Sequence, residues 1–140
     1  MRTDIRVLVV DDFTSMRRIV KSSLHEIGVR NVEEAPDGPS ALSRLRAERF
    51  DLVLLDWNMP SMPGIEVLRA IRRDPDTRLL PVLMITAELE RANVIEAARA
   101  GVSAYIAKPF TTEILRQKIA TLFPGGSEKK AATPPPPAPG

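Results

Sequence analysis

Residues 5–12 read IRVLVVDD, an almost continuous apolar run that ends in two aspartates. Four further apolar runs follow, at residues 32–35, 52–55, 82–85 and 104–107. Most of these runs are continuous rather than alternating, which is typical of strands buried on both faces of a parallel sheet. The sequence therefore predicts five short strands, the first at residues 5–10.

Amphipathic stretches lie between and after these runs. We expect helices at residues 15–27, after residue 38, after residue 64, at 91–100 and at 112–123. Gly28 and Gly101 suit helix C-termini, and Pro39 suits a first helical turn. A strand followed by a helix, repeated five times, predicts an α/β fold: one five-stranded parallel sheet with helices on both faces.

The chain has 140 residues, which fits one domain of ordinary size. We expect the folded domain at residues 1–123. The proline- and glycine-rich segment 124–140 has no apolar periodicity, so we expect a disordered tail. The first residues carry no apolar signal segment, and no run is long enough to span a membrane. These features predict a cytoplasmic protein without membrane insertion.

Composition excludes further classes of function. The chain has no cysteine, which rules out disulfides, thiol catalysis and cysteine-ligated metals. The formal net charge is only +2, and the basic residues are scattered along the expected helices rather than clustered. Nucleic acid binding would need a clustered basic footprint or a reader motif. We therefore expect no binding to nucleic acid. We also expect the protein to be a monomer.

Acidic residues end two of the expected strands. Asp11 and Asp12 follow the first strand, and Asp56 follows the third. In an open α/β sheet the carboxyl ends of the strands form the ligand-binding edge. Any one of these residues alone would be read as a cap that starts a loop. Three carboxylates at one edge repel each other unless a cation joins them, and their hard oxygen ligands suit Mg²⁺.

Polar residues also end the last two strands. Thr86 follows the fourth strand and Lys108 the fifth. A hydroxyl and an ammonium that face a carboxylate and metal cluster are suited to bind a phosphoryl group. Each residue alone would be an ordinary strand-end or surface residue. Lys108 precedes Pro109, and a cis X-Pro bond at this turn would hold the lysine inward.

Four short segments resemble those of two-component receiver domains: VVDDF at 9–13, DWNMP at 56–60, TAE at 86–88 and KPF at 108–110. The resemblance covers residues 4–123 and implies a flavodoxin-like sheet with strand order 2-1-3-4-5. Longer segments at 16–20, 31–35 and 80–84 resemble receivers that regulate chemotaxis. Pro63 departs from the pattern, because the family usually has aspartate there. We expect no loss of activity from this departure.

The resemblance also implies roles at the site. Asp56 would accept a phosphoryl group from a histidine kinase. Asp12 would bind Mg²⁺ directly, Asp11 largely through water, and Asn58 through its backbone carbonyl. The remaining implied roles are pairing with the acyl phosphate for Lys108, a hydroxyl turned toward the phosphoryl group for Thr86, and an inward movement on phosphorylation for Tyr105.

The resemblance further implies an output surface and a control of dephosphorylation. The surface would bind the flagellar motor switch protein and the kinase, and its candidate residues are Leu89, Val94, Tyr105 and Lys118. Asn58 and Glu88 would border the path of the water that hydrolyses the acyl phosphate. The chain would then be a single-domain response regulator. It would assist its own phosphorylation and dephosphorylation without being a metabolic enzyme.

Two other functions are compatible with parts of this pattern. One is a free-standing receiver that acts as a phosphorelay carrier or adaptor in another pathway. The other is a small metal-dependent phosphatase that uses an aspartyl-phosphate. Haloacid dehalogenase-type enzymes use Asp-x-Asp, whereas Asn58 holds the second position here, so the general acid is missing. Trp57, which follows Asp56 directly, is expected at the rim of the site.

Overall fold

The five strands form one parallel sheet in the order β2-β1-β3-β4-β5, which confirms the predicted class and strand order. The computed structural model describes residues 2–87 and 91–124. The strands are β1 (Arg6–Val10), β2 (Asn31–Ala35), β3 (Leu52–Asp56), β4 (Val82–Thr86) and β5 (Ala104–Ala107). The bounds differ from the predicted ones by at most one residue, since the polar strand ends also join the ladders.

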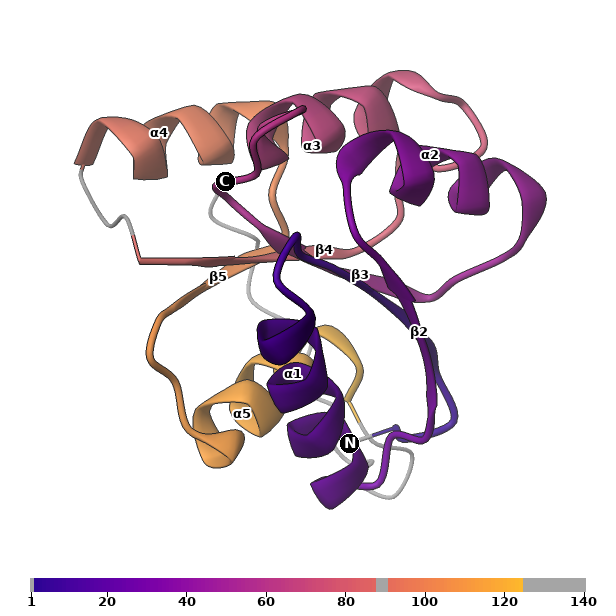
Figure 1. Ribbon diagram of the computed structural model, residues 1–140, viewed down its shortest axis with the longest axis vertical. Helices are drawn as coiled ribbons and strands as arrows, with labels where there is room; N and C mark the ends of the chain where they lie inside the picture. Colours follow the sequence, from indigo (N-terminus) through magenta and orange to yellow (C-terminus); the bar gives the residue numbers. More distant parts are fainter. Residues whose placement is uncertain (1, 88–90, 125–140) are drawn as a thin grey trace.

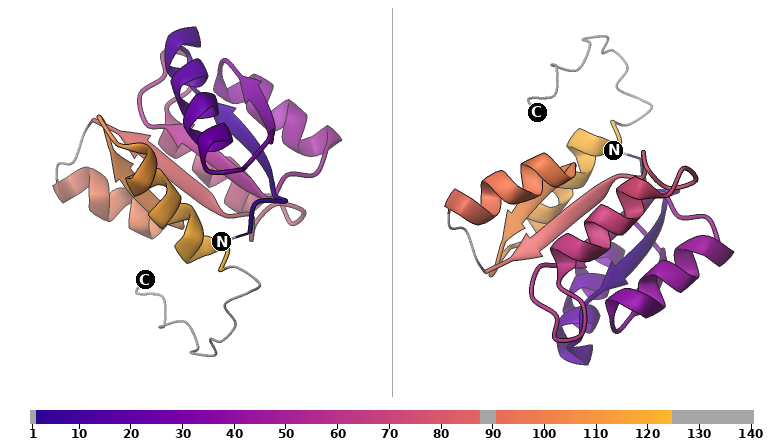
Figure 2. Two further views of the ribbon diagram at one scale, coloured as in Figure 1. Left: turned by 90° about the horizontal axis from the view of Figure 1, so that it is seen from below. Right: turned by 90° about the horizontal axis from the view of Figure 1, so that it is seen from above.

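Helices cover both faces of the sheet (Figure 1). Helices α1 (Thr14–Glu26) and α5 (Thr112–Leu122) lie on one face, and the other face carries α2 (Gly38–Ala47), α3 (Gly64–Arg73) and α4 (Arg91–Ala100). Seen from below, α1 and α5 lie in front of the sheet, and seen from above, α2, α3 and α4 lie in front of it (Figure 2). Each layer buries its own apolar cluster against the sheet.

Burial along the strands explains why their sequences are continuous rather than alternating. Every residue of β3 and β4 is buried, because both strands lie inside the sheet and are covered on both faces. The edge strand β2 has exposed and half-buried positions, and it accordingly carries Asn31, Glu33 and Glu34. Each large apolar side chain that is fully buried contributes roughly 1.5–3 kcal/mol, so the central strands contribute much of the stability of the domain.

Local signals set the helix ends. The Asp37 carboxylate accepts a hydrogen bond from the Ser40 amide (2.8 Å), and Thr111 caps α5 through the Ile114 amide (3.1 Å). Gly28 and Gly101 follow α1 and α4 with φ of 97° and 94°, a left-handed conformation that favours glycine. The predicted helix stops at these two glycines are therefore confirmed.

One expectation is wrong and several lie beyond the described structure. Trp57 is not a rim residue: it is only 8% exposed and packs in the cluster beneath α2, α3 and α4. Glu88 and Leu89 lie outside the described residues, as do the tail residues 125–140. Within residues 2–87 and 91–124, no helix is long and apolar enough to cross a membrane.

Candidate functional site

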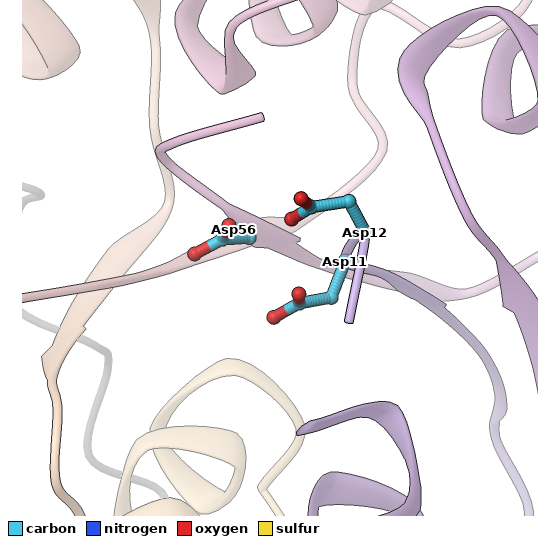
Figure 3. Close-up of side chains that lie close together, drawn as sticks. All are labelled: Asp11, Asp12 and Asp56. Atoms are coloured by element: carbon cyan, nitrogen blue, oxygen red, sulfur yellow. The ribbon is translucent and has the colours of Figure 1, made fainter. Parts of the chain in front are cut away.

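Three carboxylates meet at the carboxyl edge of the sheet, where β1 and β3 lie side by side (Figure 3). In the β1–β3 ladder Val10 pairs with Leu55, so the next residues, Asp11 and Asp56, lie next to each other at the carboxyl ends of the two strands. Asp12 comes next in the chain. One oxygen from each carboxylate lies within 4.8 Å of the others. The grouping predicted from the sequence is therefore present.

Burial and nearby negative charge oppose ionisation of Asp11 and Asp56. Asp11 and Asp56 are 3% and 4% exposed. Burial is the main cause that raises the pKa of Asp56, and the charges of Asp11 and Asp12 raise it further. Burial also raises the pKa of Asp11, while a hydrogen bond from the Phe13 amide (2.9 Å) opposes that rise. The site is therefore short of positive charge.

Lys108 supplies part of that charge. Its Nζ lies 2.8 Å from Asp56 Oδ1 and 3.8 Å from Asp11 Oδ2. The bond between Lys108 and Pro109 is cis, and the lysine side chain is directed into the site as expected. In the described part of the chain, Lys108 is the one basic side chain that forms an ion pair with any of the three carboxylates, and it pairs with two of them. Even with the charge of Arg17 near Asp11, the three carboxylates leave an excess of negative charge.

The remaining polar atoms fit a hard divalent cation. Asp12 Oδ1 is buried, and no residue of the described structure forms a hydrogen bond with it. A buried acceptor without a donor is costly unless a water or an ion satisfies it. The other two carboxylates offer oxygens within the same 4.8 Å group. Asp11, Asp12 and Asp56 are thus the residues that could hold such a cation.

Thr86 and Tyr105 lie on β4 and β5, the two strands that follow β3 across the sheet. Thr86 ends β4 and is 1% exposed, and it is one residue beyond Ile85, the partner of Asp56 in the β3–β4 ladder. Tyr105 on β5 is half-buried, and its hydroxyl donates a hydrogen bond to the Asn93 carbonyl of α4 (3.2 Å). Burial and the nearby charge of Glu96 raise the pKa of Tyr105.

The other predicted residues are not members of the acidic group. Asn58 is exposed in the loop that follows β3. Val94 and Lys118 are half-buried on α4 and α5, the helices that flank β5 on its two faces. Tyr105, Val94 and Lys118 thus come from three elements that are neighbours in the fold. Of the predicted output surface and hydrolysis control, Leu89 and Glu88 are not described.

Two residues support the acidic group and were not predicted as site residues. A Cβ atom on Gly64 would lie 2.3 Å from the Asp56 carbonyl oxygen, so only glycine lets α3 start so close to the end of β3. Arg17 of α1 donates a hydrogen bond to the Asp11 carbonyl (2.7 Å). A basic residue near the start of a helix is unfavourable for the helix dipole, and this was the available sequence signal for Arg17.

An open parallel sheet with an acidic cluster, a lysine and a threonine at its carboxyl edge defines a class of signalling domain. The family model for the response regulator receiver domain matches residues 7–120, and the chain belongs to this family. Its members are signalling regulators rather than metabolic enzymes.

Known relatives place the chain near the chemotaxis branch of the family. It is 50% identical over 119 residues to the chemotaxis protein CheY of Pseudomonas aeruginosa, an alignment that covers 85% of this chain and 96% of that protein. It is also 50% identical over 123 residues to CheY-3 of Vibrio cholerae, covering 88% and 95%. The chain is therefore closely similar to chemotaxis response regulators.

Solved structures agree with the fold. The structure of V. cholerae chemotaxis protein CheY4 matches with a TM-score of 0.78 at 35% identity, covering 83% of this chain and 96% of that one. The receiver domain of a P. aeruginosa sensor histidine kinase matches with a TM-score of 0.76 at 26% identity, covering 84% and 95%. That domain has a magnesium ion coordinated in its active site cleft.

Proposed function

We propose that this chain is a response regulator of chemotaxis that is switched by phosphorylation of Asp56. The observation that carries the proposal is the contact of 2.8 Å between Lys108 Nζ and Asp56 Oδ1 inside a group of three carboxylates. Asp56 is the member of this group that the lysine pairs with most closely. A carboxylate next to a fixed cation is well placed to receive a phosphoryl group, whose oxygens need the same positive charge.

The proposed chemistry is transfer of a phosphoryl group from a phosphohistidine of the kinase. An oxygen of Asp56 forms the new O–P bond as the N–P bond to histidine breaks, and the histidine nitrogen keeps the electron pair. Lys108 pairs with the phosphoryl oxygens. Asp12, Asp11, Asp56 and the Asn58 carbonyl hold Mg²⁺, in part through water. When bound, Mg²⁺ neutralises negative charge on the carboxylates and the phosphoryl oxygens.

The proposed output begins at Thr86. Its hydroxyl donates to a phosphoryl oxygen, and the space that it leaves is filled by the Tyr105 ring, which gives up its contact with the Asn93 carbonyl. Such a two-state element needs a bias of only a few kcal/mol to change its population substantially. The surface formed by Leu89, Val94, Tyr105 and Lys118 would then bind the flagellar motor switch protein in the cytoplasm.

Phosphorylation is tested with acetyl phosphate and Mg²⁺. Wild-type protein should gain the mass of one phosphoryl group, and Asp56→Asn should gain none. The matched control is Asp76→Asn, a change at an exposed aspartate of the opposite sheet edge, which should label like wild type. An undiminished adduct in Asp56→Asn would show that another residue is the acceptor.

The output is tested by binding. A peptide from the N-terminal segment of the motor switch protein should bind beryllofluoride-treated protein more tightly than untreated protein, and Thr86→Ala should reduce that difference. Equal binding in both states would contradict the motor output. Transfer of the phosphoryl group from Asp56 to a second histidine protein would instead support the phosphorelay role.

The proposal also assigns control of hydrolysis to Asn58 and Glu88. The attacking water must approach in line with the bond to Asp56, so side chains beside that path govern access. Asn58 is exposed, which leaves room for a larger residue. Asn58→Arg should change the decay rate of the phosphorylated protein severalfold, by the same logic of access. Its Mg²⁺ affinity should stay close to that of wild type.

A further inference from the structure

Arg17 joins three parts of the structure that meet behind the acidic group. Its Nη1 donates to the carbonyl oxygen of Asp11 (2.7 Å), and its Nε donates to Glu34 Oε1 on β2 (2.9 Å). Its Nη2 donates to Thr14 Oγ1 at the start of α1 (3.2 Å). The Arg17 side chain is only 13% exposed. An arginine that is largely buried and bonded in three directions has a fixed position.

We propose that Arg17 is a positioning residue that sets the orientation of Asp12 for metal binding. The Asp11 carbonyl belongs to the peptide group that also contains the Asp12 nitrogen. Because the peptide group is planar, holding this carbonyl fixes the direction in which the Asp12 Cα leaves it. The inference rests on the proposed function, since it concerns the same Mg²⁺ site.

The other hydrogen bonds of the surrounding loop do not restrain the carbonyl group that Arg17 binds. Helix α1 begins at Thr14 after Phe13, and no side chain caps its first turn. The loop is held by the Asp11 amide on the Ala35 carbonyl (3.2 Å) and by the Phe13 amide on Asp11 Oδ1 (2.9 Å). Neither of these hydrogen bonds reaches the Asp11 carbonyl. Arg17 therefore restrains the one peptide group that connects the two adjacent aspartates.

Positioning and simple electrostatics predict opposite results. A positive charge near a cation site repels the cation, so removing the charge of Arg17 would by itself strengthen Mg²⁺ binding. Loss of a residue that orients a ligand weakens metal binding, typically by 10–100-fold. The direction of the change therefore distinguishes the two roles.

The test measures Mg²⁺ affinity by calorimetry for the full chain. Arg17→Gln should weaken affinity by about tenfold. Arg17→Lys keeps the charge but cannot reproduce the fork of donors, so it should restore only part of that loss. The matched control is Arg18→Gln, which removes the same charge from an exposed neighbour on the same helix and should leave affinity near the wild-type value.

A measurement without metal checks the positioning directly. Hydrogen exchange of the Asp12 and Phe13 amides should be faster in Arg17→Gln than in Arg18→Gln, because the loop has lost its restraint. Glu34→Gln, which weakens the anchor of Arg17 on β2, should change affinity in the same direction by a smaller factor. Because loss of a negative charge also weakens cation binding, this variant supports the anchor without separating the two roles. If Arg17→Gln does not fold, Arg17→Lys serves instead, since weaker binding in a variant that keeps the charge cannot come from electrostatics.

Three results would overturn the proposal. These are tighter Mg²⁺ binding by Arg17→Gln, full recovery in Arg17→Lys, or loop exchange equal to that of the Arg18→Gln control. Failure of the proposed function is distinguishable, because wild-type protein would then bind no Mg²⁺ and form no phosphoryl adduct on Asp56.

Discussion

At the amino end of the sheet Glu48 is paired with two arginines, whereas at the carboxyl end one lysine pairs with two of three clustered carboxylates. Arg6 Nη2 lies 2.5 Å from Glu48 Oε1, and Arg44 lies 3.1 Å from the other oxygen of Glu48. The hydrogen bond from Arg6 is the main cause that lowers the pKa of Glu48. At the carboxyl end, burial raises the pKa values of Asp11 and Asp56.

The two ends also use their buried cations differently. Arg72, half-buried at the amino end, donates to the backbone carbonyls of Gly101 (2.9 Å), Leu80 (2.6 Å) and Arg78 (3.1 Å). It ties the C-terminus of α3 to the loops that precede β4 and β5. Lys108 instead pairs with the carboxylates of Asp56 and Asp11, and Asp56 is the proposed phosphoryl acceptor. The contacts at the amino end stabilise the fold, whereas the carboxyl end has an excess of negative charge that a ligand could neutralise.

The largest effect is expected for chemistry at Lys108. Lys108→Met should slow phosphorylation by acetyl phosphate by about 100-fold or more, the scale of losing one preorganised charge that stabilises a transferring group. Lys118→Met, which removes a lysine from α5, should leave the rate near that of wild type. Mass spectrometry over a time course measures both. A similar loss in the two variants would show that net charge, rather than the site, controls the rate.

At Arg72 we expect a loss of stability without a loss of the phosphorylation rate. Arg72→Met leaves three carbonyls without their charged donor, so we expect a loss of about 3 kcal/mol in the free energy of unfolding. Urea denaturation measures it. Phosphorylation of the folded fraction should remain close to the wild-type rate. If Arg72→Met instead impaired chemistry without loss of stability, the division of roles between the two ends would be wrong.

Gly64 tests how closely backbone packing supports the acidic end. A Cβ there would meet the Asp56 carbonyl oxygen at 2.3 Å, and a backbone atom cannot move aside easily. Gly64→Ala should cost about 2–3 kcal/mol. In Gly38→Ala the Cβ would meet the Met62 Sδ and Val67 Cγ2 atoms at 2.8 Å, and Met62 can change its rotamer. Thermal melts should therefore show a smaller loss for Gly38→Ala.

Removing one carboxylate should change stability in opposite directions at the two ends. Without divalent cations, Asp11→Asn should stabilise the fold by about 1 kcal/mol, because it relieves repulsion kept for function. Glu48→Gln should destabilise it, because Arg6 and Arg44 lose their partner. Saturating Mg²⁺ should stabilise wild-type protein more than Asp11→Asn. A destabilised Asp11→Asn in chelator would contradict the charge excess at the site.

The smallest expected effect is the pH dependence of the stability changes caused by Asp11→Asn and Glu48→Gln. Asp11 has a raised pKa in the folded state, so the fold binds its proton more tightly than the unfolded chain does. Its unfavourable contribution therefore grows as the pH rises from the ordinary value of 3.8 through the raised pKa. Glu48 has a lowered pKa, so its favourable contribution is lost as the pH falls through that pKa. Both variants should approach wild-type stability in acid, from opposite sides.

Most of the fold followed from local patterns. The continuous apolar runs predicted the strands because a strand covered on both faces has no polar side, and the residues that flank them marked the helix ends. Asp11, Asp12, Asp56, Thr86 and Lys108 could be placed at one edge because all strands of a parallel sheet end in the same direction. The resemblance to receiver domains supplied the strand order and the roles of these residues.

Other features depended on contacts between elements. Trp57 follows an acidic site residue in the chain, yet its ring turns into the core under α3. Gly64 reads as an ordinary helix start, and only its approach to the Asp56 carbonyl shows why no side chain fits. Arg17 reads as one of many surface cations until Glu34 and the Asp11 carbonyl are seen beside it.

The sequence by itself determined the class of fold, the edge of the sheet that carries the chemistry and the residue types gathered there, because periodicity is local and a repeated strand–helix order implies parallel strands. Only the tertiary structure decided which charges are paired. Glu48 and Asp11 are both ordinary carboxylates in the sequence, but Glu48 pairs with Arg6 and Arg44, whereas Asp11 is buried beside Asp12 and Asp56. Their opposite pKa shifts have main causes that no local pattern records: a hydrogen bond from Arg6 on β1 lowers the pKa of Glu48, and burial raises the pKa of Asp11.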